Sequence, residues 1–112
     1  MRPHRPTELQ CQATIIAAAK RGGWRVHAER TSLTQSGRYS TAIAGHRGFP
    51  DLVLANPTRG VVIVELKRKP NRVEPEQQRW LDVLTASGFD ARVVWVPEEL
   101  DVFCAWLIGG KS

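Results

Sequence analysis

Hydrophobic and polar positions follow two different periods along this chain. Apolar residues recur at helical spacing from Thr7 to Arg21, which predicts a helix that ends at Gly22. Thr7 and Gln10 have the spacing of a capping box, in which each side chain accepts a hydrogen bond from the other residue's backbone N–H. Residues 24–29 instead alternate between apolar and polar, which is typical of a strand.

Two short apolar runs in the middle of the chain predict neighbouring strands. Residues 52–55 and 61–66 are almost wholly apolar, and the linker between them, Asn56-Pro57-Thr58-Arg59-Gly60, is rich in turn-forming residues. This arrangement favours a β-hairpin. A strand with few polar positions is typically covered on both faces, so we expect the sheet to be flanked by helices.

The second half of the chain predicts a helix, a strand and another helix. Pro75 suits the first turn of a helix that runs to Ser87 and stops at Gly88. Residues 92–96 form an apolar strand, and a final helix opens at residues 97–99. The complete order, α-β-β-β-α-β-α, predicts an α/β fold with a mixed central sheet flanked by helices.

The size of the chain limits its organisation. A sequence of 112 residues without an internal repeat predicts a single stand-alone domain over residues 1–112, in which residues 1–6 form a mobile basic arm. No apolar stretch has membrane-spanning length and the N-terminus lacks the apolar part of a signal peptide. We therefore expect a cytoplasmic protein without a membrane partner, in which Cys11 and Cys104 are free thiols.

Positive charge dominates the polar residues. The formal net charge is +5 and the isoelectric point is about 9.9, which favours polyanionic partners. Residues 30–47 are rich in Ser, Thr, Gly and Arg and lack periodicity, which predicts a long loop leading into a functional site. The basic residues of this loop and of the segment after the second apolar run are candidates for contacts with nucleic acid: Arg30, Arg38, Arg47, Arg68, Lys69 and Arg72.

Two acids and a lysine stand at the ends of the apolar runs. Asp51 opens the first run, whereas Glu65 and Lys67 end the second. Side chains alternate along a strand, so Glu65 and Lys67 share a side that Leu66 does not. Carboxylates suit a hard divalent cation, and a neighbouring ammonium suits a phosphate or an activated water. On residue types alone, a turn residue and a solvated ion pair would be the simpler interpretation.

These residues resemble the PD-(D/E)XK nuclease signature, and the longer pattern resembles one branch of it, the VRR-NUC (virus-type replication-repair nuclease) domain. The resemblance runs from about Glu8 to Leu107 and implies a restriction-endonuclease-like core. The residues that carry it are Glu8, Gly45-His46-Arg47-Gly48-Phe49-Pro50-Asp51-Leu52, Glu65-Leu66-Lys67, Pro75-Glu76-Gln77, Trp80-Leu81, Leu84, Gly88 and Val93-Val94-Trp95.

The resemblance implies roles for individual residues. Mg²⁺ or Mn²⁺ would be bound by Glu8, Asp51, Glu65 and the Leu66 backbone carbonyl. Lys67 would position the attacking water or stabilise charge on the phosphate. The catalytic set is then Asp51, Glu65, Lys67 and Gln77. Glu8 has a second explanation, because an acid in the first turn of a helix is favoured by the helix dipole.

Gln77 and Gly48 also depart from their surroundings. Gln77 heads the apolar row that Leu81 and Leu84 continue, so its amide needs partners such as the active-site carboxylates or a phosphate. Gly48 precedes the acidic turn and would permit a close approach of the backbone.

The four tryptophans could pack in the core or stack on unpaired bases. Trp80, Trp95 and Trp106 fall in apolar rows or strands, so we expect them in the core. Trp24 fits either environment.

The resemblance further implies a metal-dependent nuclease that hydrolyses DNA phosphodiester bonds. Small stand-alone domains of this kind are typical of phage and bacterial genomes, and similar ones act as homodimers that resemble Holliday-junction resolvases. Branched, flapped or four-way DNA is therefore the expected substrate. Two other functions remain open at this point: a catalytically idle DNA-binding or recombination accessory module on the same fold, and a nuclease that acts on RNA.

Overall fold

The computed structural model describes residues 5–28 and 44–109. The elements in these ranges follow the predicted order, which confirms the α/β class. They are α1 (Glu8–Arg21), β1 (Arg25–Ala28), β2 (Leu52–Asn56), β3 (Gly60–Lys67), α2 (Pro75–Ala86), β4 (Asp90–Trp95) and α3 (Leu100–Ile108). Within the described ranges, no helix has both the length and the apolar character needed to cross a membrane.

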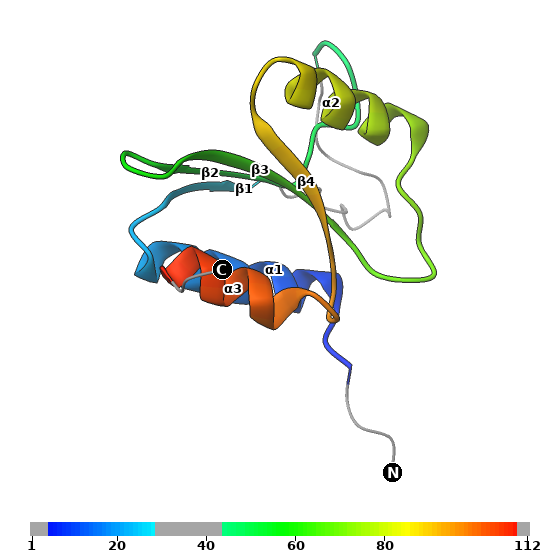
Figure 1. Cartoon of the computed structure of the whole chain (residues 1–112). Helices are drawn as coiled ribbons and strands as arrows, with labels where there is room; N and C mark the ends of the chain where they lie inside the picture. The colour runs from blue at the N-terminus through cyan, green and yellow to red at the C-terminus, as the bar shows by residue number, and fades with distance from the viewer. Residues whose placement is uncertain (1–4, 29–43, 110–112) are drawn as a thin grey trace.

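The strands form one mixed sheet in the order β1-β2-β3-β4. β1 pairs antiparallel with β2, and β2 pairs antiparallel with β3 across the predicted hairpin turn. β3 and β4 are parallel, because α2 returns the chain from the end of one strand to the start of the other. Figure 1 shows α1 and α3 side by side on one face of the sheet and α2 on the opposite face. The sheet is therefore covered by helices on both sides, as predicted.

Local hydrogen bonds explain where the helices begin. The capping box at α1 is confirmed: the Thr7 hydroxyl accepts from the Gln10 N–H at 3.1 Å, and Gln10 Oε1 accepts from the Thr7 N–H at 2.8 Å. The start of α3 was predicted too early, since the helix begins at Leu100. The Glu99 carboxylate accepts from the Trp95 N–H at 2.8 Å, and this bond holds the preceding residues in a turn.

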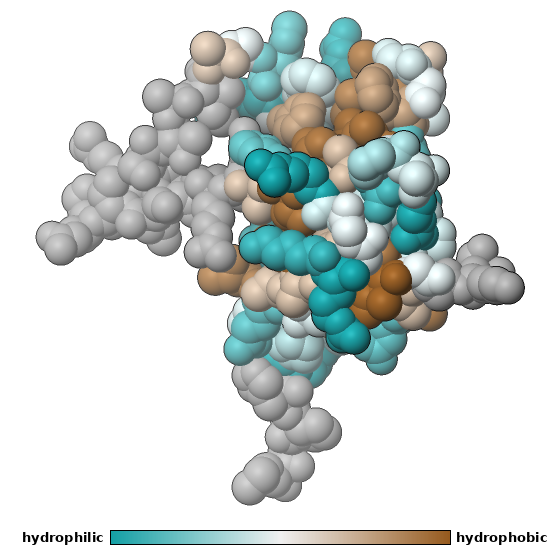
Figure 2. Space-filling model, turned by 90° about the vertical axis from the view of Figure 1, so that its left-hand side faces the viewer, coloured by the Kyte–Doolittle hydropathy of each residue, from teal (hydrophilic) through white to brown (hydrophobic). Residues whose placement is uncertain are grey.

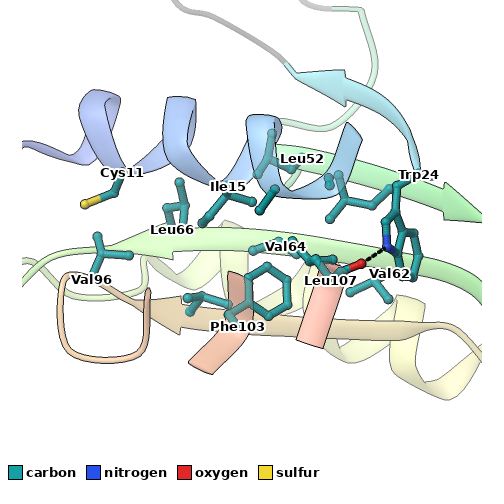
Figure 3. Packing of buried hydrophobic residues seen from close by; sticks show 14 residues of the cluster. Cys11, Ile15, Trp24, Leu52, Val62, Val64, Leu66, Val96, Phe103 and Leu107 are labelled. Carbon is teal, nitrogen blue, oxygen red and sulfur yellow. Dashed lines mark hydrogen bonds between the residues drawn. The ribbon is translucent and has the colours of Figure 1, made fainter. Parts of the chain in front are cut away.

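The main core lies between the sheet and the α1–α3 pair. Alternate residues of the central strands point into it, and Figure 3 shows them packed against side chains from both helices. Its members include Ile15, Leu52, Leu54, Val62, Val64, Leu66, Val94, Val96, Phe103 and Leu107. Full burial of one such side chain contributes about 1.5–3 kcal/mol, so this layer is the main source of the domain's stability.

The C-terminal end of α3 is held by Arg59 from the hairpin turn. Its guanidinium donates to the Trp106 carbonyl at 2.6 Å and the Leu107 carbonyl at 3.0 Å. It also lies over the rings of Trp24 and Trp106, at 5.0 and 4.5 Å from their centroids. The Trp24 indole donates to the same Leu107 carbonyl at 2.8 Å (Figure 3). We refer to Trp24, Arg59 and the last turn of α3 as the α3 clasp.

The tryptophans are not distributed as expected. Trp24 is buried in the core, whereas Trp80, Trp95 and Trp106 are only half-buried. The prediction of core positions for these three is therefore wrong in part: they lie at the margins of the packed layers, where Trp106 stacks beside Phe103 and Arg59.

The remaining surface features agree with an ordinary globular domain. Both cysteines within the described ranges are free thiols, as predicted. Figure 2 looks at the molecule from the side of the β2–β3 turn, and on this face hydrophilic and hydrophobic residues are intermixed.

Candidate active site

Asp51 and Glu65 meet where β2 begins beside the end of β3. Leu52 pairs with Val64 in the antiparallel register, so one further step places Asp51 opposite Glu65. The Asp51 carboxylate crosses to the neighbouring strand, where Oδ2 accepts a hydrogen bond from the Leu66 backbone N–H at 2.8 Å. The acids are thus adjacent because of the strand register, although 14 positions apart along the chain.

Glu65 is an ionisable group in a buried position. Its residue is 2% exposed, and its Oε2 lies 3.0 Å from Gln77 Nε2 and 3.7 Å from Lys67 Nζ. Its other oxygen, Oε1, is buried without a hydrogen-bond partner among the described residues. Burial, with the charge of Asp51 as a second cause, raises the pKa of Glu65 to about 8, and the charge of Lys67 opposes both.

Lys67 lies on the face predicted from the alternation of side chains. Glu65 and Lys67 contact each other on the α2 side of β3, whereas Leu66 between them belongs to the main core. The side chain of Lys67 is 12% exposed, so its ammonium group can reach a ligand from solvent while remaining beside Glu65.

Gln77 connects α2 to this carboxylate. The Glu74 backbone N–H donates to Gln77 Oε1 at 2.8 Å at the start of the helix. Since the amide oxygen is occupied there, the amide nitrogen is the atom that faces Glu65. Glu65 is thus the carboxylate partner that was predicted for the polar Gln77 side chain at the head of the apolar row of α2.

Glu8 approaches the same end of the sheet from the first turn of α1. It is half-buried, and its Oε2 lies 3.4 Å from Asn71 Nδ2 in the segment after β3. The charge of Glu8 is a further cause of the raised pKa of Glu65. The other two predicted acidic ligands, Asp51 and Glu8, therefore both lie within electrostatic range of Glu65.

The acids have the chemistry that a hard divalent cation requires, but the described side chains are not arranged as a closed set of ligands. Within residues 5–28 and 44–109, no three His, Cys, Asp or Glu side chains are gathered closely enough to hold a metal ion. The available donors are nevertheless all oxygen atoms, which Mg²⁺ and Mn²⁺ prefer. A buried carboxylate oxygen without a partner, such as Glu65 Oε1, is unfavourable until a cation or a donor reaches it.

The loop before β2 is fastened to α2. Gly48 has φ +89°, and a Cβ atom there would lie 2.8 Å from the Glu76 carbonyl carbon and 2.9 Å from the Gln77 nitrogen. The neighbouring Arg47 carbonyl accepts from the Trp80 indole at 2.9 Å. Gly48 therefore permits the close backbone approach predicted from the sequence, and this approach sets the position of Gln77 relative to Asp51.

The structure describes only some of the residues that are predicted to contact nucleic acid. Arg47, Lys69 and Arg72 are exposed, whereas Arg68 is half-buried and its Nε is buried without a partner among the described residues. The even spacing that turns Lys67 toward the site turns Arg68 toward α1. There its charge opposes the rise that burial causes in the pKa of the Cys11 thiol. Arg30 and Arg38 lie outside the described residues.

Three contributors to the site were not predicted from the sequence. They are the backbone N–H of Glu74, the Asn71 amide and the indole of Trp95, which pairs with Lys67 across the parallel strands. A strand alternation count from Val93 could have indicated the face of Trp95, but only the register with β3 shows what lies beside it.

Comparisons with known proteins agree with this geometry. The family model of the VRR-NUC domain matches residues 35–98, more than half of the chain. The Fanconi-associated nuclease 1 homolog of Caenorhabditis elegans is 44% identical over 50 residues, which make up 44% of this chain and 6% of that protein. The chain thus spans only a small part of this relative's length.

Solved structures show the same fold. One, a VRR_NUC domain, superposes with a TM-score of 0.61 at 25% identity, over 85% of this chain and 90% of the other. A second, a VRR_NUC domain protein, gives 0.63 at 18% identity, over 93% and 92%. Together with the family match, they show that this chain belongs to the VRR-NUC domain family, a group of PD-(D/E)XK-type nuclease domains.

Proposed function

We propose that this domain hydrolyses phosphodiester bonds in DNA with Mg²⁺ or Mn²⁺. The observation that carries the proposal is the convergence of Asp51, Glu65 and Lys67 at one end of the sheet, with a buried carboxylate oxygen that lacks a partner among the described residues. Membership of a family whose nuclease domains generally use a divalent metal supports the same function.

The metal would be held by Asp51 and Glu65, with Glu8 and the Leu66 carbonyl as further oxygen ligands. When bound, it would make a water molecule nucleophilic at neutral pH and offset charge on the phosphate. The chain itself orients these groups: the Leu66 N–H holds Asp51, and Gln77 holds one oxygen of Glu65. Lys67 would place its positive charge beside a phosphate oxygen, where negative charge develops during hydrolysis.

The substrate would be DNA with branches, flaps or four-way junctions. The net charge of +5 supports a polyanionic substrate, and the exposed Arg47, Lys69 and Arg72 would contact its phosphates. Arg30, Arg38 and Arg68 are further proposed contacts. The name of the Caenorhabditis elegans relative, a Fanconi-associated nuclease, supports a nuclease function and a place in DNA repair.

A cleavage panel tests the proposal. Linear, flapped and four-way DNA and a matched RNA would be incubated with Mg²⁺, Mn²⁺ or chelator, with Asp51→Asn as the inactive control. We expect cleavage of DNA with either metal, none in chelator, and the fastest cleavage on a branched substrate. Full activity in chelator would contradict the mechanism. Binding of DNA without cleavage would favour the accessory module, and cleavage of RNA alone would favour the ribonuclease.

We also propose that the chain acts in the cytoplasm as a homodimer, in which two sites cut two strands. A domain of 112 residues offers a limited surface for holding a junction, and symmetric dimers are the commonest oligomers. Light scattering with and without DNA should give twice the monomer mass. A monomer mass under both conditions would exclude the paired cut and leave the nuclease assignment intact.

A further inference from the structure

The face of the sheet that carries Lys67 also carries an aromatic side chain. Trp95 is the register partner of Lys67 in the parallel β3–β4 pair. The preceding register partners, Leu66 and Val94, both belong to the core on the opposite face. Since partners in register point to the same side of a sheet, Trp95 lies beside Lys67, one strand spacing away, or about 4.8 Å.

The backbone of Trp95 is held by hydrogen bonds, whereas its side chain is only half-buried. Its backbone N–H donates to Glu99 Oε1 at 2.8 Å, and its carbonyl accepts from the Glu99 N–H at 2.7 Å. The indoles of Trp24 and Trp80 donate to carbonyl oxygens at 2.8 and 2.9 Å, whereas the half-buried indole of Trp95 has no acceptor among the described residues. These bonds hold its backbone in place, and part of the side chain remains exposed to a ligand.

Lys69 adds a cation beside this ring. Its Nζ lies 6.0 Å from the centroid of the Trp95 ring, within the range of a cation–π contact. The side chain is exposed, and it stands two residues after Lys67 on the segment that leaves β3. An aromatic face and an ammonium group thus stand together directly beside the proposed catalytic lysine.

We propose that Trp95 and Lys69 form a subsite for one unpaired nucleotide next to the scissile phosphate, with the base stacked on the indole and its phosphate on the ammonium. The proposal rests on the proposed function, since it takes Lys67 as the group at the scissile phosphate. Both faces of a base inside a duplex are covered by its neighbours, so only an unstacked base can lie on this ring. Stacking is tolerant of sequence, because every base has a π-face.

An abasic scan of single-stranded DNA tests the subsite. A labelled oligonucleotide would carry one abasic residue, moved one position at a time through the segment that the protein covers. Binding to the full chain would be measured by fluorescence anisotropy without divalent metal, and single-turnover cleavage would be measured with Mn²⁺. For the parent chain we expect one position at which loss of the base weakens binding by about 5- to 150-fold, the range for one base stacked on an aromatic side chain.

Variants assign this loss to the ring. Trp95→Leu keeps an apolar side chain but removes the π-face, so it should bind intact DNA more weakly by the same factor and become insensitive to the abasic residue. Trp95→Tyr should retain most of the effect. Phe89→Ala, which removes an exposed aromatic side chain just before the opposite end of β4, is the matched control and should leave the scan unchanged. Lys69→Ala should weaken binding to every oligonucleotide alike and lower its salt dependence.

The two levels of the proposal can fail separately. If Trp95→Leu shows the same loss at the same abasic position as the parent chain, the base does not stack on Trp95 and the subsite is excluded. If the parent chain cleaves no substrate with any metal, the proposed function is wrong, yet the binding scan still decides whether Trp95 receives a base. Melting curves for each variant separate a loss of binding from a loss of folded protein.

Discussion

Glu65 and Lys67 have different tasks, although they contact each other. Glu65 is buried, and its pKa is raised because its surroundings disfavour its charge. Lys67 offsets part of this effect from 3.7 Å and stays accessible to a ligand. The pair therefore separates two functions that a single residue could not combine, namely holding a cation and meeting a phosphate.

Replacement of each residue should affect the reaction differently. Glu65→Gln removes a ligand charge, so metal affinity and cleavage should fall together. Lys67→Ala leaves the carboxylates in place, so metal should still bind while cleavage slows on the order of 100- to 1000-fold. Calorimetric titration with Mn²⁺ beside single-turnover cleavage would show the difference, and Lys20→Ala, an exposed lysine of α1, serves as the control. A Lys67→Ala variant that cleaved at the parent rate would show that Lys67 belongs to the basic surface.

The buried carboxylate should also make the metal-free domain sensitive to pH. Glu65 has a pKa of about 8 in the folded chain against an ordinary value of 4.5, so the folded state holds its proton more tightly than the unfolded state. Its contribution to stability is complete below the ordinary pKa and is lost as the pH rises through about 8. Each unit of such a shift corresponds to about 1.4 kcal/mol.

Urea unfolding in chelator, from about pH 5 to about pH 9, would measure this loss. The parent chain should lose free energy of unfolding relative to Glu65→Gln as the pH rises, because the amide does not ionise. A parent chain that gained stability relative to this variant would show that Glu65 is charged and well compensated in the folded protein.

Alternation of side chains predicted the shared face of Glu65 and Lys67, and the apolar row of α2 predicted that Gln77 would seek a partner. The position of Trp95 could not be predicted in the same way. Its strand is apolar, which suggested a core position. That Trp95 lies beside Lys67 follows only from the pairing of β3 with β4, two strands that are distant in sequence. Residue type indicates preference for burial, but register decides which residues become neighbours.

At the level of elements, α2 is the part of the fold that completes the site. It stands on the face opposite α1 and α3 (Figure 1), and its first turn brings Gln77 to Glu65. Its position depends on the loop before β2, whose backbone touches α2 at Gly48. The loop and the helix are therefore positioned together, and a shift of the backbone at their contact should alter the hydrogen bond between Gln77 and the Glu65 carboxylate.

Two glycines of that loop allow the contribution of this contact to stability and activity to be measured. Gly45 and Gly48 have φ of +88° and +89°, so alanine is strained at both, by about 1 kcal/mol or more. Only Gly48 has backbone atoms closer than 3.0 Å to the added Cβ, while Gly45 has nothing within 4 Å. Gly48→Ala should therefore destabilise the domain more than Gly45→Ala and also slow cleavage. Equal losses of stability and activity in the two variants would show that the approach to α2 is unimportant.

The order of elements was predictable because periodicity, capping residues and turn residues agree with one another along the described chain. The start of α3 was not, since Pro97-Glu98-Glu99 resembles a helix N-terminus in its composition. The Glu99 carboxylate instead binds the Trp95 N–H and delays the helix to Leu100. A local side-chain hydrogen bond of this kind competes with the helix and leaves no periodic signal.

At the scale of the whole molecule, the two ends of β3 serve different purposes. Its C-terminal end carries Glu65 and Lys67, whereas the turn before its N-terminal end carries Arg59 of the α3 clasp. The clasp joins the hairpin turn to α3 and closes the core on the side away from the site. Stability and chemistry are therefore supported at opposite ends of β3.

Loss of the clasp should reduce stability without affecting the reaction. Arg59→Ala removes the donors to the Trp106 and Leu107 carbonyls and should lower the free energy of unfolding by about 2 kcal/mol. Arg25→Ala, an exposed arginine of β1, should change it by less than about 0.5 kcal/mol. Urea unfolding and cleavage per folded molecule would be measured together. A loss of cleavage rate in fully folded Arg59→Ala would contradict the separation of the two ends.

The exposed hairpin turn offers an attachment point at which a label should not affect the reaction. Pro57 is exposed in the turn before β3, and Glu65 lies five positions after Gly60, roughly 17 Å farther along the strand. Cys11 is buried and Cys104 is half-buried, so a thiol introduced by Pro57→Cys would be the most accessible one among the described residues. A fluorophore or a surface tether linked there would let single molecules be watched while they search for, hold and cut one DNA molecule.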